Sequence, residues 1–342
     1  MSQDPQELRW VELMRAGDDA LATGALDRAA ELYAAAAALA RDAGAPEALG
    51  TSLHRAAVAR DRQGRHDEAA WLAGQALHMD EQALGPVHPA VARDLHALGL
   101  ASLGQGKASE AAALLDRSAS ISRRLSSPRE LLLTLLSLGR AHARTASIDD
   151  ARAAFSDALQ LADRVEGATG AALRALHGLA ELDVHAGKLA EAHATWVAAT
   201  RRGAGPEAQV QWRPELANAW LGLGQLAENG RQDNEDAIWM YSLVLRSLGP
   251  LRTTTGARAL AQLDRLGAAP QLLPDAVMPP DQFIVVHWQA DSARGDIAHP
   301  FGGRHTFEAA AAPDGLRVGH RVQVHVRDGA LAQLDIVPDP QA

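Results

Sequence analysis

A sequence unit of about 41 residues recurs along most of this chain, and it restricts the fold more than any other feature. The clearest copy places a small residue at Gly99, a turn at Gly106, an alanine at Ala111 and a large apolar residue at Leu115. The same order returns around turn positions 24, 64, 106, 146 and 187, which are 40, 42, 40 and 41 residues apart. This pattern predicts helix, turn, helix in each unit. One such hairpin cannot bury its apolar face alone, so the units are expected to stack.

A sixth unit begins at Trp220, continues through Gly224 and reaches Tyr241, with a longer turn between its helices. The six units together span about residues 8 to 248. Small residues on the first helices are expected to let the two helices of one hairpin approach closely, and they are Gly17, Gly99, Gly139 and Gly224. Large side chains on the second helices are expected to fill the space between neighbouring repeats, and they are Tyr33, Leu115, Phe155, Trp196 and Tyr241.

These residues resemble the tetratricopeptide-repeat (TPR) signature, W-x2-L-G followed later by A-x3-F, which is most complete from Trp220 onward. The period of 40 to 42 residues and the connector Ala83-Leu84-Gly85-Pro86-Val87-His88-Pro89 are similar to the kinesin-light-chain type of repeat. Ala97 and Ser137 stand where that type has asparagine. The resemblance implies a right-handed superhelix of TPR helical hairpins that binds partners along its concave surface.

The repeats are followed by one more predicted helix and a linker. Thr253 to Thr255 offer an N-cap, and the apolar stripe from Ala257 to Leu266 ends at Gly267. Four prolines between positions 268 and 280 then predict a semi-rigid linker. The expected domains are therefore residues 1–267 for the repeats with their capping helix, 268–280 for the linker and 281–340 for a separate C-terminal domain.

The hydrophobic period changes to two in that C-terminal domain. Strands are expected at Phe283 to Val286, Val322 to Val326 and Leu331 to Val337, with a hairpin turn at Asp328-Gly329. The run Val286-His287-Trp288 and the last 25 residues resemble a cold-shock, OB-type domain. The resemblance implies a small all-β barrel, so the whole chain is expected to be mainly α with this barrel at its end.

An OB-type barrel would bind single-stranded nucleic acid by stacking bases on aromatic side chains. The candidates for a reduced platform of this kind are Trp288, Phe301, His305 and Phe307. The alternative interpretation is that these rings fill the barrel core. The domain has eight acidic and five basic residues, and this negative balance disfavours nucleic acid because phosphate neutralisation supplies most of the affinity.

The inner face of the predicted superhelix is rich in imidazole and guanidinium groups. Projecting the first helix of each unit onto the repeat frame puts six side chains there: His54, His96, Arg140, Arg144, Arg174 and His177. Such a row could bind an acidic peptide or a C-terminal carboxylate, because arginine forms bidentate charge-assisted hydrogen bonds. The alternative interpretation is an ordinary solvated helix face.

Composition and charge exclude several other functions. The chain has 342 residues, a net charge of −9 and no cysteine, so thiolate metal sites and cysteine nucleophiles are excluded and duplex DNA is disfavoured as a partner. No apolar run is long enough for a secretory signal or a membrane span, so a cytoplasmic protein is expected. The fourteen histidines lack metal-ligand spacing, and no catalytic motif is present. We therefore expect no enzyme, no cofactor and no metal.

The sequence thus predicts a non-catalytic scaffold or adaptor that binds a partner protein or peptide along the TPR groove. Two alternatives stay open. The C-terminal barrel would make the chain a nucleic-acid-associated regulator. A concave repeat surface would also suit a sensor of a small ligand.

Overall fold

The computed structural model describes residues 5–203, 213–231, 234–248 and 253–268, and near the C-terminus residues 282–289, 294–299, 303–308, 313, 316, 321–327 and 330–336. The chain divides into two compact units, Met1–Ala171 and Ala172–Ala342. This division falls inside the repeat array. The expected domain limits at 267 and 281 stay a prediction, and most of the expected linker, residues 269–280, lies outside the described residues.

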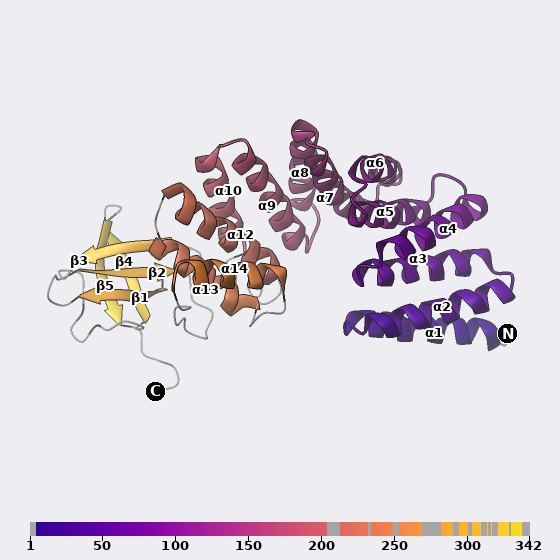
Figure 1. Cartoon of the computed structure of the whole chain (residues 1–342), viewed down its shortest axis with the longest axis horizontal. Helices are drawn as coiled ribbons and strands as arrows, with labels where there is room; N and C mark the ends of the chain where they lie inside the picture. Colours follow the sequence, from indigo (N-terminus) through magenta and orange to yellow (C-terminus); the bar gives the residue numbers. More distant parts are fainter. Residues whose placement is uncertain are drawn as a thin grey trace. The chain divides into compact units, whose positions relative to one another are not determined.

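The first unit consists of four helical hairpins, which confirms the predicted repeat architecture. Figure 1 shows the hairpins side by side in chain order, and each helix contacts the next one along the chain. The hairpins are α1 (Pro5–Ala22) with α2 (Leu26–Asp42), α3 (Pro46–Arg62) with α4 (His66–Leu84), α5 (Pro89–Gly104) with α6 (Ala108–Arg124), and α7 (Pro128–Arg144) with α8 (Ile148–Ala162).

A three-residue turn joins the two helices of each of these hairpins, and its middle residue is the one that the repeat pattern predicted. Gly24, Gly64 and Gly106 have φ between 76° and 80°, and Ala146 has φ 57°. In the third hairpin, the Lys107 N–H donates to the Ser102 carbonyl at 2.8 Å. This six-to-one hydrogen bond is the Schellman closure, which needs a left-handed residue just before the donor. The repeat therefore ends each first helix by one local mechanism.

Glycines on the first helices let the paired helices approach. A methyl group added at Gly139 would lie 2.7 Å from the ring of Phe155, and one at Gly17 would lie 2.5 Å from the ring of Tyr33. The rings of Tyr33 and Phe155 are buried. The close approach of the paired helices at these glycines agrees with the prediction. The large side chains, expected between neighbouring repeats, here pack against the glycine of their own hairpin.

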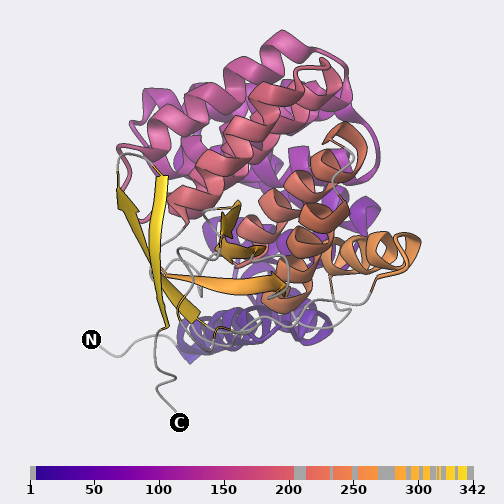
Figure 2. The same cartoon turned by 90° about the vertical axis from the view of Figure 1, so that its left-hand side faces the viewer.

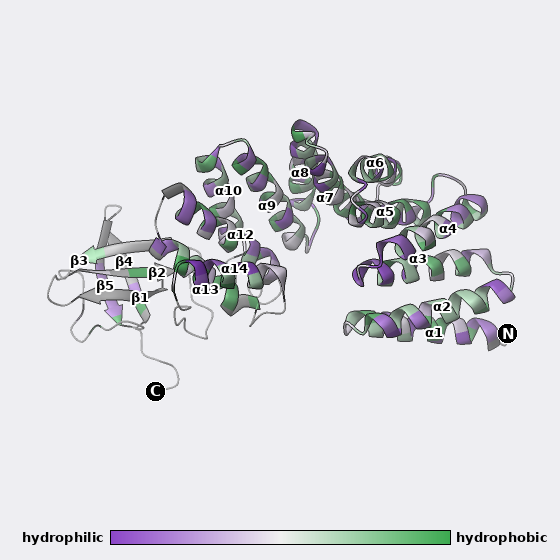
Figure 3. Cartoon of the chain, in the orientation of Figure 1, coloured by the Kyte–Doolittle hydropathy of each residue, from purple (hydrophilic) through white to green (hydrophobic). Residues whose placement is uncertain are grey.

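The helices of the first unit are amphipathic, with apolar and polar residues on the same helix (Figure 3). Most of the buried positions are alanines, such as Ala29, Ala36, Ala111 and Ala151, none of which is more than 1% exposed. Small buried side chains allow the helix backbones to lie close together, so the alanine-rich composition suits a stack of hairpins rather than a thick core.

The second unit continues the repeats and ends in a sheet. Its helices are α9 (Thr169–His185), α10 (Leu189–Arg202), α12 (Arg213–Leu226), α13 (Asn234–Leu248) and α14 (Thr254–Arg265), with a π-helical turn at Ala227–Arg231 after α12. Gly187 has φ 73° in the turn between α9 and α10. The extra turn of the sixth unit is this π-helical segment. The predicted capping helix is α14, and the Thr253 hydroxyl accepts a hydrogen bond from the Gly256 N–H at 3.1 Å.

The C-terminal residues form one antiparallel sheet of five strands in the order β3-β2-β1-β4-β5. The strands are β1 (Gln282–Gln289), β2 (Arg294–His299), β3 (Gly303–Glu308), β4 (Arg321–Arg327) and β5 (Ala330–Ile336). Figure 2, a quarter turn from Figure 1, shows strands running in different directions, as in a strongly twisted sheet. Ile297, Phe307, Leu316, Val322 and Leu334 form its buried core.

The predicted barrel is not established by this sheet. Among the described strands, β3 pairs only with β2 and β5 only with β4, so no pairing closes the sheet on itself. The OB-type barrel therefore stays a prediction. The expected turn at Asp328-Gly329 lies outside the described residues.

Candidate partner-binding site

The first helices of the hairpins in the first unit share one face. α3 contacts α5 and α5 contacts α7, although a second helix intervenes along the chain in each case. Side chains that point away from the hairpin cores of these three helices therefore lie near one another. The surface formed by these side chains of α3, α5 and α7 is called the inner face. Four of the six predicted groove residues lie on these helices: His54, His96, Arg140 and Arg144.

His54 links the second hairpin to the third. Its Nδ1 lies 2.8 Å from Oδ1 of Asp94 on α5. The carboxylate of Asp94 can only accept, so Nδ1–H is the donor. Asp94 is 1% exposed, and the histidine beside it is half-buried. His54 therefore holds a buried carboxylate as well as facing the inner surface.

His96 makes the equivalent link from the third hairpin to the fourth. Its Nε2 lies 3.0 Å from the hydroxyl of Ser137 on α7, and that hydroxyl donates to the Leu133 carbonyl at 3.1 Å. Because the hydroxyl has one hydrogen, Nε2–H of His96 is the donor. Burial lowers the pKa of His96 to about 4, with a further lowering from His54. At neutral pH this imidazole is an uncharged hydrogen-bonding group, and it adds no positive charge to the groove.

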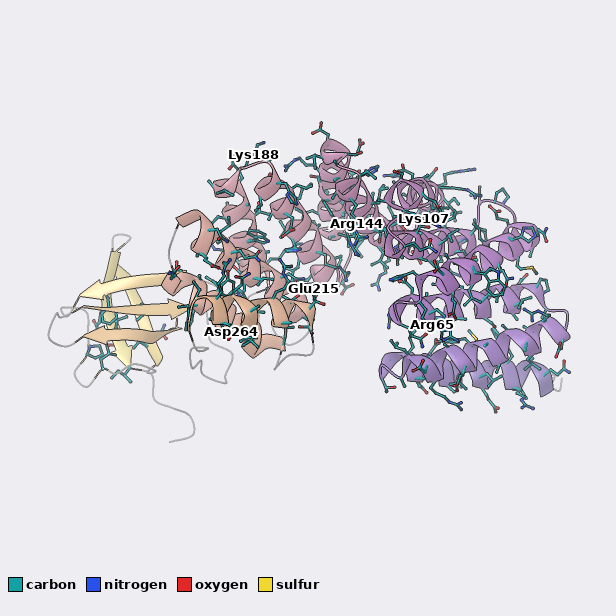
Figure 4. The ribbon with its side chains drawn as sticks, in the orientation of Figure 1. Arg65, Lys107, Arg144, Lys188, Glu215 and Asp264 are labelled. Atoms are coloured by element: carbon teal, nitrogen blue, oxygen red, sulfur yellow. The ribbon has the colours of Figure 1, made fainter. Side chains whose placement is uncertain are left out.

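Arg144, which is labelled in Figure 4, has an exposed side chain that is hydrogen-bonded to the preceding hairpin. Its guanidinium donates to the Leu103 carbonyl near the end of α5 at 2.7 Å, and that carbonyl also accepts from the Gly106 N–H at 3.1 Å. Arg140 lies on the same helix and is exposed.

Arg174 and His177 lie on α9 of the second unit. The Arg174 guanidinium is 3.6 Å from the carboxylate of Glu215 on α12. Nδ1 of His177 accepts from Nε1–H of Trp196 at 3.2 Å, and burial is the main cause that lowers its pKa. Since Nδ1 is an acceptor, this histidine is also neutral. Both residues support packing between helices of their own unit.

A cavity of about 430 Å³ opens between α3, α5 and α7. His54 and His96 both line it, so the structure brings together two of the predicted residues, whereas Arg140 and Arg144 are not among its lining residues. The apolar part of the wall includes Val58, Leu100 and Leu133, and Leu133 is 47% exposed. The charged part of the wall consists of Arg62, Arg93, Arg129, Asp61 and Glu130.

Sequence reasoning missed the three arginines because the cavity runs obliquely across the repeats. The cavity is lined by Arg62 at the end of α3, Arg93 in the first half of α5 and Arg129 at the start of α7. The repeat frame selects the same position in each helix and so cannot reveal a surface that shifts along the helix from one repeat to the next. Exposed arginines one or two turns from positions 54, 96 and 137 on α3, α5 and α7 are the sequence signal for these three residues.

The predicted aromatic platform falls largely on residues whose side chains are not described. Trp288 lies on β1 opposite Gly295 of β2, and His305 lies on β3 opposite Ile297. Phe301 lies outside the described residues. Phe307 is 3% exposed and belongs to the core of the sheet. For Phe307, the alternative interpretation of core filling holds.

In the described part of the chain, no group of three or more histidine, aspartate or glutamate side chains is arranged to hold a metal ion. None of the helices described there combines the length and the apolar composition needed to cross a bilayer.

Solved structures share this helical fold. The chain is similar to Pseudomonas aeruginosa PilF, with a TM-score of 0.50 and 17% identity over 76% of this chain and 100% of PilF. It is similar to a Rap protein complexed with competence and sporulation factor, with a TM-score of 0.53 and 13% identity over 78% of this chain and 76% of that one. It is also similar to the apo form of RapI, with a TM-score of 0.53 and 10% identity over 75% of this chain and 98% of that one. No protein-family model and no curated protein matches the chain. The likeness concerns the TPR-like fold alone.

Proposed function

We propose that this chain is a non-catalytic scaffold that binds a partner protein or peptide on the inner face of its first unit. Its repeats are of the kinesin-light-chain type, on the evidence of their period and of the connector before α5. In that connector Gly85 has φ 81°, and Nδ1 of His88 accepts from the Ala90 N–H at 3.3 Å to begin the helix.

The cavity between α3, α5 and α7 carries this proposal. Its volume of about 430 Å³ suits a few side chains of a bound segment. Repeat folds use such inner surfaces because each repeat contributes a short rigid strip to a continuous platform. Leu133 is one of the few large apolar side chains that are exposed, and it lies in this wall.

The charge of the wall favours an acidic ligand. Three arginines face two carboxylates, and one of the carboxylates, Asp61, already lies 2.8 Å from Nδ1 of His66. Among the described residues, neither Arg62 nor Arg93 forms an ion pair within 4 Å, although the charge of Arg93 acts on the buried Asp80 and lowers its pKa. Neutral His96 adds a polar group. A segment with a carboxylate beside an apolar side chain fits this combination.

The similar folds are consistent with a ligand-binding role. A Rap protein with this fold is complexed with competence and sporulation factor. At 13% identity the likeness does not extend to binding residues. Support for binding by this chain therefore comes from its own cavity.

No observation favours the alternative of nucleic-acid binding through the sheet. Of the four predicted platform residues, the structure describes only the side chain of Phe307, which is buried. The full chain titrated with labelled single-stranded RNA at low salt tests this alternative directly, because electrostatic binding would raise the anisotropy and weaken as salt is added.

Site-specific photo-crosslinking tests the scaffold proposal. A benzoyl-phenylalanine placed at Leu133 is expected to cross-link the same discrete partner from an extract of the source organism in repeated captures. The matched control places it at Ala113, which is exposed on α6, a second helix. Arg93→Glu combined with Arg129→Glu should reduce the cross-link at least tenfold, whereas Arg123→Glu on α6 should leave it unchanged.

The proposal is contradicted if cross-linking from position 133 equals that from position 113, or if the double charge reversal leaves it intact. Circular dichroism of each variant establishes that the helices are retained.

A further inference from the structure

A second cavity, of about 600 Å³, lies at the N-terminal end of the first unit, between α1, the end of α2 and the start of α3. Its apolar wall includes Leu39, Ala40 and Pro46. Its only charged lining side chains among the described residues are Glu7 and Glu47. The sign of its charge is therefore opposite to that of the arginine-lined cavity.

Trp10 gives this cavity a fixed aromatic wall. The indole Nε1–H donates to the Ser52 hydroxyl at 2.9 Å, and that hydroxyl donates to the Ala48 carbonyl at 2.7 Å. The ring also packs against the buried cluster that contains Leu49 and Leu53. Because the N–H is already used inside the protein, the ring offers a ligand its π surface rather than a hydrogen-bond donor.

The charges of the two glutamates are not paired within the described part of the chain. In the described part of the chain, neither Glu7 nor Glu47 forms an ion pair with an arginine, lysine or histidine. Both stand in the first turn of their helices, where a carboxylate stabilises the helix dipole. That role explains their presence in the sequence. It does not explain why both line one cavity with an indole and no basic residue.

An indole face together with carboxylates is the combination that binds organic cations. The ring quadrupole attracts an ammonium or guanidinium group placed over its face, and the carboxylates add Coulomb attraction. An anion would be repelled. An uncharged apolar group would gain burial but none of the electrostatic attraction.

We propose that the cavity at Trp10, Glu7 and Glu47 is a subsite for a basic side chain, lysine or arginine, of the bound partner. This inference rests on the proposed scaffold function. α3 contributes Glu47 and Thr51 to this subsite and Arg62 to the other cavity. The stretch of helix from Thr51 to Arg62 rises roughly 16 Å, which about five residues of extended chain span. The inner face thus selects a segment with a basic residue followed or preceded, about five residues away, by an acidic one.

The test uses the full chain labelled with 5-fluorotryptophan and small probes of defined charge. The chain has seven tryptophans, and the spectrum of Trp10→Phe assigns the Trp10 fluorine signal. We expect N-acetyl-lysine amide and N-acetyl-arginine amide to shift that signal in a saturable manner. N-acetyl-norleucine amide and N-acetyl-glutamate amide should not shift it.

Charge removal separates the subsite from general surface electrostatics. Glu7→Gln and Glu47→Gln should each raise the dissociation constant for the lysine probe about two- to fivefold, the usual range for one exposed ion pair. Glu12→Gln, an exposed position on α1 outside the cavity, is the matched control and should change nothing.

Two results would overturn the inference: equal shifts with the lysine and norleucine probes, or unchanged lysine binding in the doubly substituted Glu7→Gln, Glu47→Gln chain. Neither result bears on the crosslink from position 133. Failure of the basic subsite is therefore distinguishable from failure of the scaffold proposal, and Trp10 substitutions are used only to assign the signal.

Discussion

Nδ1 of His54 lies 2.8 Å from Oδ1 of Asp94, across the junction between the second and third hairpins. A second carboxylate, that of Asp80 on α4, lies close to Asp94, and the two residues are only 3% and 1% exposed. Oδ1 of Asp80 and Oδ2 of Asp94 have no hydrogen-bond partner when both groups are ionised. Burial and the charge of Asp94 favour the protonated form of Asp80, which can share its proton with Asp94 in a hydrogen bond.

Stability of the first unit should depend on the charge of Asp80. Burial first, and then the charge of Asp94, raise the pKa of Asp80 from 3.8 to about 7, while Arg93 opposes the shift and Glu47 adds to it. Because the folded-state pKa is raised, this contribution to stability is complete below about pH 4 and is lost as the pH rises to about 7. Asp80→Asn keeps a donor toward Asp94 without an ionisable group. Its stability relative to the wild type should increase from pH 5 to pH 8.

Urea denaturation of both proteins at the two pH values measures this difference. Asp116→Asn, at an exposed position on α6, is the control and should show no such trend. A difference between Asp80→Asn and wild type that is the same at pH 5 and pH 8 would rule out the shared proton.

The imidazole of His96 should make stability depend on pH in the opposite direction to Asp80. Its pKa is lowered from 6.5 to about 4 by burial, so the unfolded chain binds the proton more tightly than the folded one. This contribution to stability is present above pH 6.5 and is lost as the pH falls toward 4. His96→Gln should therefore lose less thermal stability between pH 7 and pH 5 than the wild type does. His78→Gln, exposed on α4, is the matched control, and an identical acid response in His96→Gln and wild type would show that His96 titrates normally.

The close approach of α7 and α8 should make Gly139 intolerant of a methyl group. A Cβ there would lie 2.7 Å from the Phe155 ring, so Gly139→Ala should destabilise the protein by about 1–3 kcal/mol. Gly74→Ala, inside α4 with open space around it, should instead stabilise it by about 0.5–1 kcal/mol through helix propensity. Thermal denaturation of the two variants measures both values. Equal effects of the two substitutions would mean that helix propensity, and not packing against Phe155, governs position 139.

The turn at Ala146 should be improved by glycine. Ala146 has φ 57°, whereas the equivalent Gly106 has φ 80° and nothing within 4 Å of an added Cβ. A left-handed backbone costs a residue with a Cβ about 1–2 kcal/mol. Ala146→Gly should therefore raise the free energy of unfolding by about 1 kcal/mol, and Gly106→Ala should lower it by a similar amount, as measured by urea denaturation. Changes of the same sign in both variants would contradict the shared turn geometry.

Local features of the repeat were predictable because each depends on residues close together in the sequence. The turn at Gly64 was predictable because glycine adopts a left-handed backbone readily, and the close approach of two helices at Gly139 was predictable because that residue has no side chain. The capping helix α14 follows from the Thr253 N-cap. The barrel was harder to predict from the sequence, because its closure depends on pairing between β3 and β5, which are separated along the chain. Among the described strands, these two are not paired.

The sequence by itself determined that this chain forms stacked helical hairpins, where each turns, and where a glycine lets the two helices of a hairpin approach. Only the tertiary structure decided the chemistry of the inner face. Arg62, Arg93 and Arg129 line one cavity, and Glu7 and Glu47 line another, because the packing of neighbouring hairpins brings residues that are distant in sequence together. The charge state of His96 likewise depends on burial by the following repeat, about 41 residues away in sequence. Such contacts have no local signature, because they arise from the angle at which one hairpin lies on the next.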